Sequence, residues 1–470
     1  MGGIFGTVSR SDCVRSLFYG IDYHFHLGTK RGGMAVWNGR QFVRTIHSIE
    51  SDYFRSKFEP DLDKFSGHLG IGVISDNDSQ PLVIGSHLGN FAIVTVARIT
   101  NMAALTEQAY DRRQPFSEST SGAVNPTELV ATLICQADSF EDGIRMAQEQ
   151  IDGSCSLLLL TRKGVYAARD RRGRTPLIIG RNTDGFAVAS ESCAFPNLGF
   201  ETCREIGPGE IVFMTPDGFE QRRPPLDATQ VCSFLWVYYG YPASSYEGIN
   251  VEAVRYRCGG ALARRDDITP DYVAGIPDSG IGHALGYAHG KQIPYKRPYV
   301  KYTPTWPRSF MPQNQQMRDL VANMKLIPLT SLIAGQRILF CDDSIVRGTQ
   351  LKDNVEDLFA GGAAEVHMRI ACPTLIHPCD FLAFSTSRST LDLAGRRAIT
   401  ELEGVEEPDA EVMQEYATAG TPRHQAMVEK IRRRLHLTTL KYQTMDDLVE
   451  AIGRPKEKLC THCWDGSSYF

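Results

Sequence analysis

The stretch Ile338-Leu-Phe-Cys-Asp-Asp-Ser-Ile-Val-Arg-Gly-Thr-Gln350 decides how the second half of the chain folds. Its apolar beginning predicts a strand that delivers two adjacent carboxylates, Asp342 and Asp343, to its carboxyl end, where α/β proteins bind their ligands. Residues 344–349 then predict a turn before a helix, where backbone N–H groups, hydroxyls and the helix dipole converge. This turn suits a terminal phosphate, and the two carboxylates suit a sugar diol or a hydrated Mg²⁺.

Strands and helices alternate around this stretch. Apolar strands are predicted at 272–276, 337–341 and 365–371, with a helix at 252–263 and another after the Asp-Asp turn. This alternation is typical of a parallel sheet with crossover helices. The strand at 272–276 ends in Pro277-Asp-Ser-Gly280, a second turn suited to an anion. Taken alone, the Pro277–Gly280 stretch favours the ordinary interpretation, a routine turn. The Asp-Asp-Ser run could likewise be a solvated strand end and helix cap, but its thirteen residues favour a phosphate site.

The first half of the chain has a different pattern, with short strands bounded by glycine and helices at 125–136 and 139–150. The predicted strands lie at 70–74, 91–96, 156–161, 164–168 and 185–190. Arg222-Arg-Pro-Pro-Leu226 predicts an extended linker between the two patterns. From about residue 390 the chain is predicted to be mostly helical, with helices that begin at Thr421 and Thr444.

Length and composition limit the possible classes of protein. The 470 residues are too many for one compact domain, so two or three are expected. Hydrophobic residues make up 42% and the net charge is −5, which excludes a disordered chain and does not indicate nucleic-acid binding. The longest aliphatic run, 157–160, is too short for a membrane span, the beginning lacks the plan of a signal peptide, and Gly6 does not fit myristoylation. We therefore expect a cytoplasmic protein, whose 12 cysteines do not indicate disulfides, although Cys460-Thr-His-Cys463 is typical of a metal or redox site.

These motifs resemble those of a known family. The run at 338–350 matches the signature of type I phosphoribosyltransferases, which bind phosphoribosyl pyrophosphate (PRPP). Over its whole length the chain resembles the amidophosphoribosyltransferase family, glutamine-dependent enzymes that commit PRPP to purine biosynthesis. The motifs that carry this resemblance are Val165-Tyr-Ala-Ala-Arg-Asp-Arg-Arg-Gly-Arg-Thr-Pro-Leu177, Ala189-Ser-Glu-Ser-Cys-Ala194, Pro208-Gly-Glu-Ile211, Phe234-Leu-Trp-Val-Tyr-Tyr239, Glu247-Gly-Ile249, Pro277-Asp-Ser-Gly280 and Arg308-Ser-Phe-Met-Pro312.

The resemblance implies a fold in two main parts. Residues 1–222 would form an α+β domain, a degenerate glutaminase domain of the Ntn-hydrolase-like αββα sandwich type. Residues 226–395 would form an α/β type I phosphoribosyltransferase domain with a parallel sheet, and residues 396–470 a helical C-terminal segment with the Cys-x-x-Cys metal ligands. A homo-oligomer, either a dimer or a tetramer, is expected.

By the same resemblance, the two turns bind PRPP, with the ribose hydroxyls, Mg²⁺ and 5-phosphate at 342–349 and the pyrophosphate side at 278–280. The expected PRPP-binding residues are Asp278, Ser279, Gly280, Asp342, Asp343, Ser344, Ile345, Val346, Arg347, Gly348 and Thr349, with Ser279, Asp342 and Asp343 near Mg²⁺. In the family a mobile loop closes over PRPP, and here it would supply Lys296, Tyr299 and Arg308 as catalytic residues. The loop carries an apparent insert, Thr303-Pro-Thr-Trp-Pro307, and an ordinary exposed, proline-rich loop is the alternative.

The first half departs from the family where its chemistry should be. Family members begin Met-Cys-Gly-Ile and lose the methionine, so that the cysteine attacks glutamine, whereas Gly2 stands in that place here. The other replaced positions are Ser75 for a substrate-binding arginine, Val96-Ala97 for the Asn-Gly of the oxyanion hole, Pro126 for the aspartate that binds the glutamine amine, and His26-Leu-Gly28 for a His-Arg-Gly. Cys13 is expected in the core rather than as a substitute nucleophile. We therefore predict that glutaminase activity is absent.

Some family members hold a [4Fe–4S] cluster with four cysteines, whose motifs correspond here to Cys232, Cys379, Cys460 and Cys463. Four thiolates suit either an iron–sulfur cluster or tetrahedral zinc. Cys372 competes with Cys379 for its position, and free thiols on a frayed chain end are the plain alternative. A metal centre of this kind would pin the C-terminal segment to the transferase domain.

For the whole chain the resemblance implies a glycosyltransferase that forms 5-phosphoribosylamine from PRPP with ammonia, either free or delivered by a separate glutaminase. Two alternatives stay open: a pseudoenzyme that binds PRPP and regulates an active paralogue, and a transferase with a different nucleophile. The loop insert and Asn323, where the family tends to have arginine, favour drift from full catalysis. Purine nucleotides are expected as inhibitors, and nucleic acids and membranes are not expected as partners.

Overall fold

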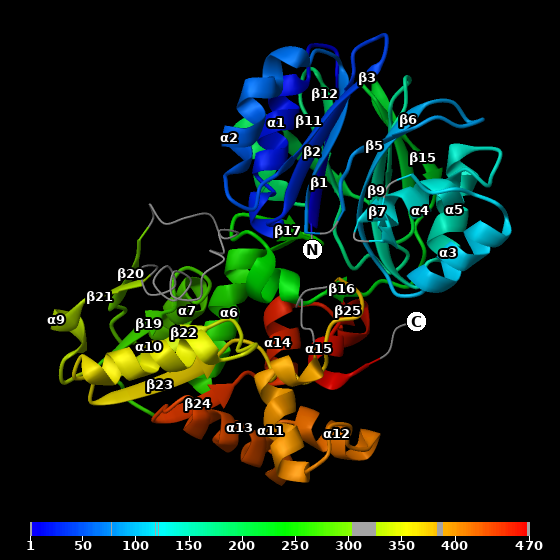
Figure 1. Cartoon of the computed structure of the whole chain (residues 1–470). Helices are drawn as coiled ribbons and strands as arrows, with labels where there is room; N and C mark the ends of the chain where they lie inside the picture. The colour runs from blue at the N-terminus through cyan, green and yellow to red at the C-terminus, as the bar shows by residue number, and fades with distance from the viewer. Residues whose placement is uncertain are drawn as a thin grey trace.

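The computed structural model describes residues 2–76, 78–117, 119–120, 122–302, 326–382 and 389–467. Two antiparallel sheets pack face to face in its N-terminal half (Figure 1), with the strand orders β13-β11-β12-β1-β4-β2-β3 and β15-β14-β10-β9-β6-β5. The strands of the first sheet are β1 (Gly2–Ser9), β2 (Arg31–Trp37), β3 (Phe42–Ser48), β4 (Leu69–Ser75), β11 (Ile178–Arg181), β12 (Gly185–Ala189) and β13 (Glu201–Glu205). Those of the second are β5 (Leu82–Ile84), β6 (Phe91–Ile99), β9 (Gly153–Leu160), β10 (Val165–Ala168), β14 (Ile211–Thr215) and β15 (Gly218–Arg223).

Strand β9 shows how the sequence produces these layers. Leu158 and Leu160 lie in the core between the two sheets, whereas Leu157 and Leu159 lie in the core beneath helices α4 (Pro126–Ile134) and α5 (Phe140–Gln150). Because successive side chains of a strand point to opposite faces, one run of leucines serves both cores. Helices α1 (Val14–Asp22) and α2 (Phe54–Phe58) cover the first sheet, and α3 (Met102–Asp111), α4 and α5 cover the second (Figure 1). The predicted αββα sandwich is confirmed.

The C-terminal half is built on a parallel sheet of the order β19-β22-β23-β24. Leu339 of the second strand packs against α6 and α7, and Phe340, on the opposite face, shares a core with α10. Helices on both faces are what the predicted parallel α/β domain requires. The elements are β19 (Tyr272–Gly275), β22 (Arg337–Asp342), β23 (Glu365–Ile370), β24 (Thr439–Tyr442), α6 (Val251–Arg264), α7 (Ile281–Lys291) and α10 (Thr349–Ala360).

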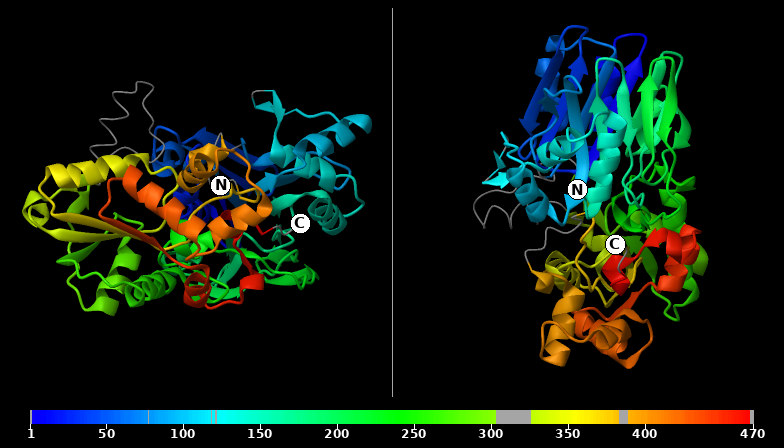
Figure 2. Two further views of the ribbon diagram at one scale, coloured as in Figure 1. Left: turned by 90° about the horizontal axis from the view of Figure 1, so that it is seen from below. Right: turned by 90° about the vertical axis from the view of Figure 1, so that its right-hand side faces the viewer.

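Strand β24 departs from the sequence prediction, which has the C-terminal segment mostly helical. It lies between helices α13 (Pro422–Arg434) and α14 (Met445–Ile452) and pairs with β23, His367 opposite Thr439. A strand of four residues is too short to be identified from its sequence pattern. It becomes an edge strand of the sheet only because β23 lies beside it and pairs with it. The C-terminal segment therefore completes the sheet, while α11 (Ala394–Glu403), α12 (Ala410–Ala417) and α13 lie on the side away from the sandwich (Figure 2).

Shorter elements connect these parts. They are β7 (Ser119–Thr120), β8 (Ala123–Val124), β16 (Val231–Cys232), β17 (Ser245–Tyr246), β18 (Ile249–Asn250), β20 (Tyr299–Lys301), β21 (Leu326–Pro328), α9 (Thr330–Ile333), β25 (Leu459–Cys460) and α15 (His462–Asp465). Strand β16, which follows the sandwich, pairs in parallel with β25 near the end of the chain. No helix within the described ranges has both the length and the apolar character that a membrane span requires.

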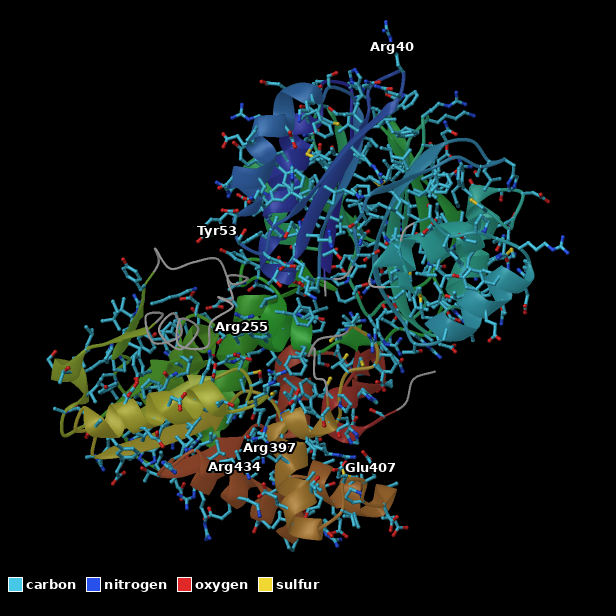
Figure 3. The ribbon with its side chains drawn as sticks, viewed as in Figure 1. Arg40, Tyr53, Arg255, Arg397, Glu407 and Arg434 are labelled. Atoms are coloured by element: carbon cyan, nitrogen blue, oxygen red, sulfur yellow. The ribbon has the colours of Figure 1, made fainter. Side chains whose placement is uncertain are left out.

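Buried polar contacts join the two halves. Arg169 of the sandwich forms an ion pair with Glu247 at 2.8 Å, and the fully buried Glu191 accepts a hydrogen bond from the Ser244 hydroxyl. Within the C-terminal half, Arg255 of α6, which lies near this junction (Figure 3), donates to the backbone carbonyls of residues 236, 238 and 240. The Arg169–Glu247 and Ser244–Glu191 contacts give buried charges fixed partners across the junction, so they help to define how the halves dock.

Candidate functional site

The two predicted turns meet at the carboxyl edge of the parallel sheet, because β19 and β22 are neighbours. The Ser279 hydroxyl donates to Asp342 Oδ1 at 3.1 Å, and the backbone N–H of Asp343 donates to the same oxygen at 2.9 Å. The Ser344 hydroxyl donates to Asp343 Oδ2 at 2.6 Å. The structure therefore brings together the three residues that the sequence assigns to the metal side of this site.

The two adjacent carboxylates at this edge, Asp342 and Asp343, favour the binding of a cation. Desolvation and the neighbouring Asp343 carboxylate raise the pKa of Asp342 well above its usual range. Mg²⁺ relieves such repulsion and needs only one or two carboxylates, since waters and phosphate oxygens complete its shell. The Asp342–Asp343 pair fits that ion. Within the described ranges, no group of three or more His, Cys, Asp or Glu side chains has the arrangement needed to hold a metal ion by itself.

The turn after β22 leads directly into helix α10. Gly348 precedes the helix with a left-handed φ of 78°, a conformation that glycine adopts without strain. The turn is held by the Val346 carbonyl, which accepts from Ala394 N at 2.7 Å, and by an Arg347–Asp392 ion pair at 3.2 Å. The predicted turn is thus present, with the N-terminus of an α-helix behind it, a geometry suited to a phosphate group.

The turn after β19 passes very close to β22. A Cβ on Gly280 would lie 2.1 Å from the Cys341 carbonyl oxygen, so only glycine fits there. Asp278 forms an ion pair with Lys301, Nζ to Oδ2 at 2.6 Å. Sequence reasoning did not single out Lys301, although it lies in the stretch expected to lead into the mobile loop, two residues after Tyr299.

The other residues expected from that loop lie elsewhere. Tyr299 is 3% exposed, and its hydroxyl donates to the Asn354 carbonyl at 3.0 Å, so this side chain is part of the core. Lys296 places its amine 5.0 Å from the ring centre of Tyr272, at the amino end of β19 and away from the turns. The structure does not bring these two to the Asp342 edge. Arg308, the 303–307 insert and Asn323 lie outside the described residues.

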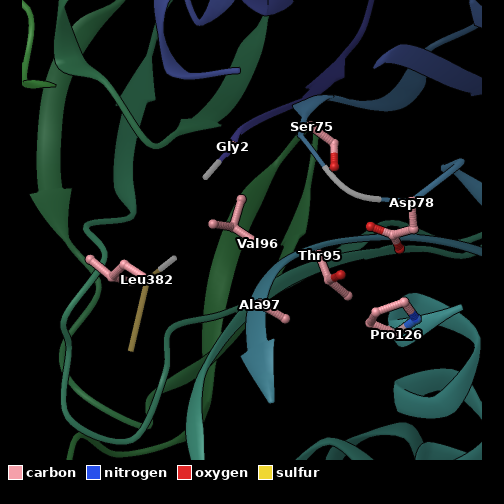
Figure 4. Close-up of a pocket in the computed structure, with 8 residues that line it drawn as sticks. All are labelled: Gly2, Ser75, Asp78, Thr95, Val96, Ala97, Pro126 and Leu382. Carbon is pink, nitrogen blue, oxygen red and sulfur yellow. The ribbon is translucent and has the colours of Figure 1, made fainter. Parts of the chain in front are cut away.

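In the sandwich, the positions predicted to have lost their catalytic residues line one pocket, although they come from distant parts of the chain. This remnant pocket (Figure 4) is lined by Gly2, Ser75, Asp78, Thr95, Val96, Ala97, Pro126 and Leu382. Gly2 and Ser75 are paired across β1 and β4. The cavity measures about 20 Å³, room for a water-sized molecule rather than an amino acid.

Three residues of the remnant pocket, Asp78, Thr95 and Leu382, were missed by sequence reasoning. Asp78 accepts a hydrogen bond from the Thr127 hydroxyl at 2.5 Å, so its carboxylate is bound to the first turn of α4. Burial raises the pKa of this carboxyl. Leu382 belongs to the C-terminal half and lies at the pocket across the junction (Figure 4). Nothing local in the sequence indicates either contact, because each depends on how remote segments pack.

The remaining candidates of this half belong to the framework. Cys13 is 1% exposed, and burial with the nearby Asp12 raises its thiol pKa to about 12, which leaves it inert as a nucleophile. His26 pairs with the buried Glu191 at 3.1 Å. Both support the folded sandwich rather than chemistry in the remnant pocket.

The four-cysteine group, Cys232, Cys379, Cys460 and Cys463, comes together at the junction. Cys232 lies opposite Cys460 in the β16–β25 pair. Cys463 lies beside the Cys379 thiol, and its carbonyl accepts hydrogen bonds from the N–H groups of residues 376 and 377 at 3.1 Å. Cys372, the competitor for Cys379, lies instead near Asp343, Cys258 and Trp464.

The thiols of this group have the chemistry of metal ligands, although no three of them are arranged around a single ion in the part of the chain that the structure describes. Burial and the neighbouring thiols Cys460 and Cys379 raise the pKa of Cys232, and burial raises that of Cys460 to about 11. Buried thiols that suppress one another's ionisation become thiolates only when a cation takes up their charge, as metal binding does. A [4Fe–4S] cluster and a zinc ion both meet this requirement.

Comparison with known proteins agrees with both halves. A family model described as a glutamine amidotransferase domain matches residues 68–197. The amidophosphoribosyltransferase of Mycobacterium tuberculosis is 30% identical, over 99% of this chain and 85% of its own, and that of Methanocaldococcus jannaschii is 29% identical over 99% and 97%. A solved structure of the B. subtilis glutamine PRPP amidotransferase, complexed with ADP and GMP, superposes with a TM-score of 0.82 at 27% identity and covers 99% of this chain and 96% of that one. With the same two halves in the same order along nearly the full length, the chain belongs to the amidophosphoribosyltransferase family.

Proposed function

We propose that this chain transfers the phosphoribosyl group of PRPP to ammonia, forming 5-phosphoribosylamine for purine biosynthesis, and that it does not hydrolyse glutamine. One contrast carries the proposal. The edge at Ser279, Asp342 and Asp343 keeps its hydrogen-bonded arrangement, whereas the remnant pocket has no nucleophile at Gly2 and measures about 20 Å³. A transferase site has been kept while a glutaminase site has not.

The residues of the edge have separate roles in this reaction. Asp342 and Asp343 accept hydrogen bonds from the ribose hydroxyls, and the turn at 344–349 with the N-terminus of α10 binds the 5-phosphate. Lys301 and the Asp278–Gly280 backbone orient the pyrophosphate. When Mg²⁺ is bound, it offsets the negative charge of the departing pyrophosphate. The fixed donors and acceptors thus stabilise the oxocarbenium-like centre that ammonia attacks.

Three positions argue against glutamine as the nitrogen donor in the proposed reaction. Gly2 lacks a thiol, Val96 offers no polar side chain to an oxyanion, and Pro126 has no carboxylate for the substrate amine. Ammonia therefore comes from solution or from a separate glutaminase.

We further propose that the four-cysteine group binds a [4Fe–4S] cluster or zinc, and that purine nucleotides inhibit the protein. The first point is supported by the placement of Cys232 opposite Cys460 and of Cys463 beside Cys379. The B. subtilis relative, whose structure holds ADP and GMP, supports the second. We also propose that the protein is a cytoplasmic homo-oligomer.

The test is release of pyrophosphate from PRPP and Mg²⁺, measured with ammonium and then with glutamine in the same assay. Activity is expected with ammonium and should rise with pH as more NH₃ is free, while glutamine should give only background. Asp342→Asn serves as the matched inactive control.

Glutamate formation by the unmodified protein would overturn the proposal. If neither nitrogen source supports turnover although calorimetry detects PRPP binding, the chain is instead the PRPP-binding pseudoenzyme that regulates an active paralogue.

A further inference from the structure

One residue of the sandwich, Arg174, contacts every chain segment that carries the four-cysteine group. Its carbonyl oxygen accepts a hydrogen bond from the Cys232 N–H at 3.2 Å. Its guanidinium lies beside the Cys460 thiol, on the segment that also carries Cys463, and favours the ionised form of that thiol by lowering its pKa against the effect of burial. Its Cζ atom lies 3.7 Å from the ring centre of Phe381, two residues after Cys379. The backbone and the side chain of this one residue together reach three segments that lie far apart in sequence.

Arg174 is firmly held in this position. The residue is 1% exposed, its Nη1 donates to the Gly153 carbonyl at 2.8 Å, and its backbone N–H donates to Asp170 Oδ1 at 3.1 Å. A guanidinium stays charged under all conditions in proteins, so a fixed cation lies beside the thiols. Four thiolates carry more negative charge than a zinc ion or the core of a [4Fe–4S] cluster neutralises, so the loaded site is an anion that this cation complements.

A second contact links the same site to the sandwich. The backbone N–H of Leu382 donates to the Cys379 sulfur at 3.4 Å, and the Leu382 side chain lines the remnant pocket (Figure 4). The segment at 379–382 therefore carries a cysteine of the group, the aromatic partner of Arg174 and a side chain at the former glutaminase site. This segment therefore has contacts in both halves.

We propose that Arg174 is the positioning residue and charge partner of the metal centre, so that the centre is completed by the sandwich and metal loading is linked to docking of the two halves. This inference rests on the proposed metal binding by the four-cysteine group. It gives the sandwich a role that does not require glutaminase chemistry: the sandwich shapes and neutralises the centre that pins the C-terminal segment.

The experiment uses the full-length protein, prepared anaerobically, and three variants: Arg174→Gln, Arg174→Lys and the control Arg204→Gln. Arg204 is a half-buried arginine whose partners, the Glu210 carboxylate and the Phe219 ring, both belong to the sandwich, so this control leaves the contacts between the halves in place. The readout is the rate at which the metal passes to a chelator, together with the visible spectrum of the iron form or of a cobalt-substituted zinc site.

Arg174→Gln is expected to release the metal at least about tenfold faster, the usual effect of a lost hydrogen bond to a charged group. Arg174→Lys keeps the positive charge but not the planar guanidinium, so it should release the metal at a rate between those of Arg174→Gln and the wild type. The control should release the metal at the wild-type rate. In an iron form, loss of the cation should also lower the reduction potential, because the reduced cluster carries more negative charge.

The outcomes separate the two proposals. A wild-type protein that binds no metal would overturn the metal centre and this inference with it. A wild-type protein that binds metal, with unchanged release and spectrum in folded Arg174→Gln, would overturn the role of Arg174 alone. If Arg174→Gln does not fold, Arg174→Lys decides: metal release faster than in the wild type supports the role, and release at the wild-type rate overturns it.

Discussion

At the scale of single residues, Asp342 joins the parallel sheet to the proposed ligand. Replacing it with asparagine keeps the shape but removes the charge that accepts from Ser279 and Asp343 N–H. We expect Asp342→Asn to weaken PRPP binding in the presence of Mg²⁺ by about tenfold to a hundredfold, the usual range for a hydrogen bond to a charged group. Calorimetric titration measures this change. Asp271→Asn, which removes an exposed partner of Arg337 at the amino end of the sheet, should bind PRPP like the wild type.

Gly2 occupies the position at which the resemblance places the nucleophile, and under the proposed function we expect that restoring this one residue does not restore a glutaminase site. A Cβ at this position would lie 2.6 Å from the Ile74 carbonyl oxygen, so a side chain requires the β1–β4 pair to shift. A new thiol would still lack an oxyanion hole beside Val96 and room for glutamine. We expect Gly2→Cys to form glutamate from glutamine no faster than the unmodified protein. Glutaminase activity in this single variant would contradict the proposed loss of the site.

At the scale of elements, the approach of β19 to β22 depends on glycine at the turn. A methyl group at residue 280 would lie 2.1 Å from the Cys341 carbonyl, and the strand end cannot move aside as a flexible side chain does. We expect Gly280→Ala to lower the free energy of unfolding by about 1–3 kcal/mol. The matched control is Gly260→Ala in α6, where the nearest atom lies 3.9 Å away and alanine should stabilise the helix by about 0.5–1 kcal/mol. Urea denaturation of both variants checks the sign at each position.

Strand β23 is tied to the loop after α6 by a buried ion pair, Arg369 with Asp266 at 2.5 Å, both fully buried. Burial opposes ionisation of this carboxyl, but Arg369, Tyr287 and Lys441 outweigh it and hold the Asp266 pKa below its usual range. In the unfolded chain this carboxyl titrates at about pH 4. Because its pKa is lower in the folded protein, the ion pair stabilises the fold above about pH 4, and this stabilisation is lost as the pH falls further.

Asp266→Asn breaks this pair and leaves Arg369 buried without its partner carboxylate. We expect a loss of about 3–5 kcal/mol at neutral pH, measured by chemical denaturation. The variant should also lose less of its stability than the wild type between about pH 5 and pH 3. If both proteins lose free energy of unfolding equally steeply over this pH range, other carboxylates dominate the acid sensitivity of the fold.

At the scale of the whole molecule, the four-cysteine group draws its members from three segments that meet only in the folded chain. Cys379 and Cys372 lie seven positions apart on the same connection, but only Cys379 lies beside Cys463. We expect Cys379→Ser to lose most of the bound metal and Cys372→Ser, the matched control, to keep it. Metal analysis of the two purified proteins measures this. Retention in Cys379→Ser with loss in Cys372→Ser would exchange the two assignments.

The sequence by itself was sufficient for the features that depend on neighbours along the chain. The turn at 342–349, the leucines of β9, the caps of α4 and α5 and the alternation of strands and helices follow from short-range periodicity and turn chemistry. These patterns act over a few residues, so a single chain reveals them. The resemblance extended them to two domains in the right order.

Only the tertiary structure decided which distant residues meet. Ser279 reaches Asp342 because β19 and β22 pair, β24 is a strand because β23 lies beside it, and Arg174 reaches the cysteines because the two halves dock. Lys301 and Asp78 likewise acquire partners, Asp278 and Thr127, from other elements. The physical reason is that such contacts depend on burial and register over the whole chain, and a local pattern contains neither.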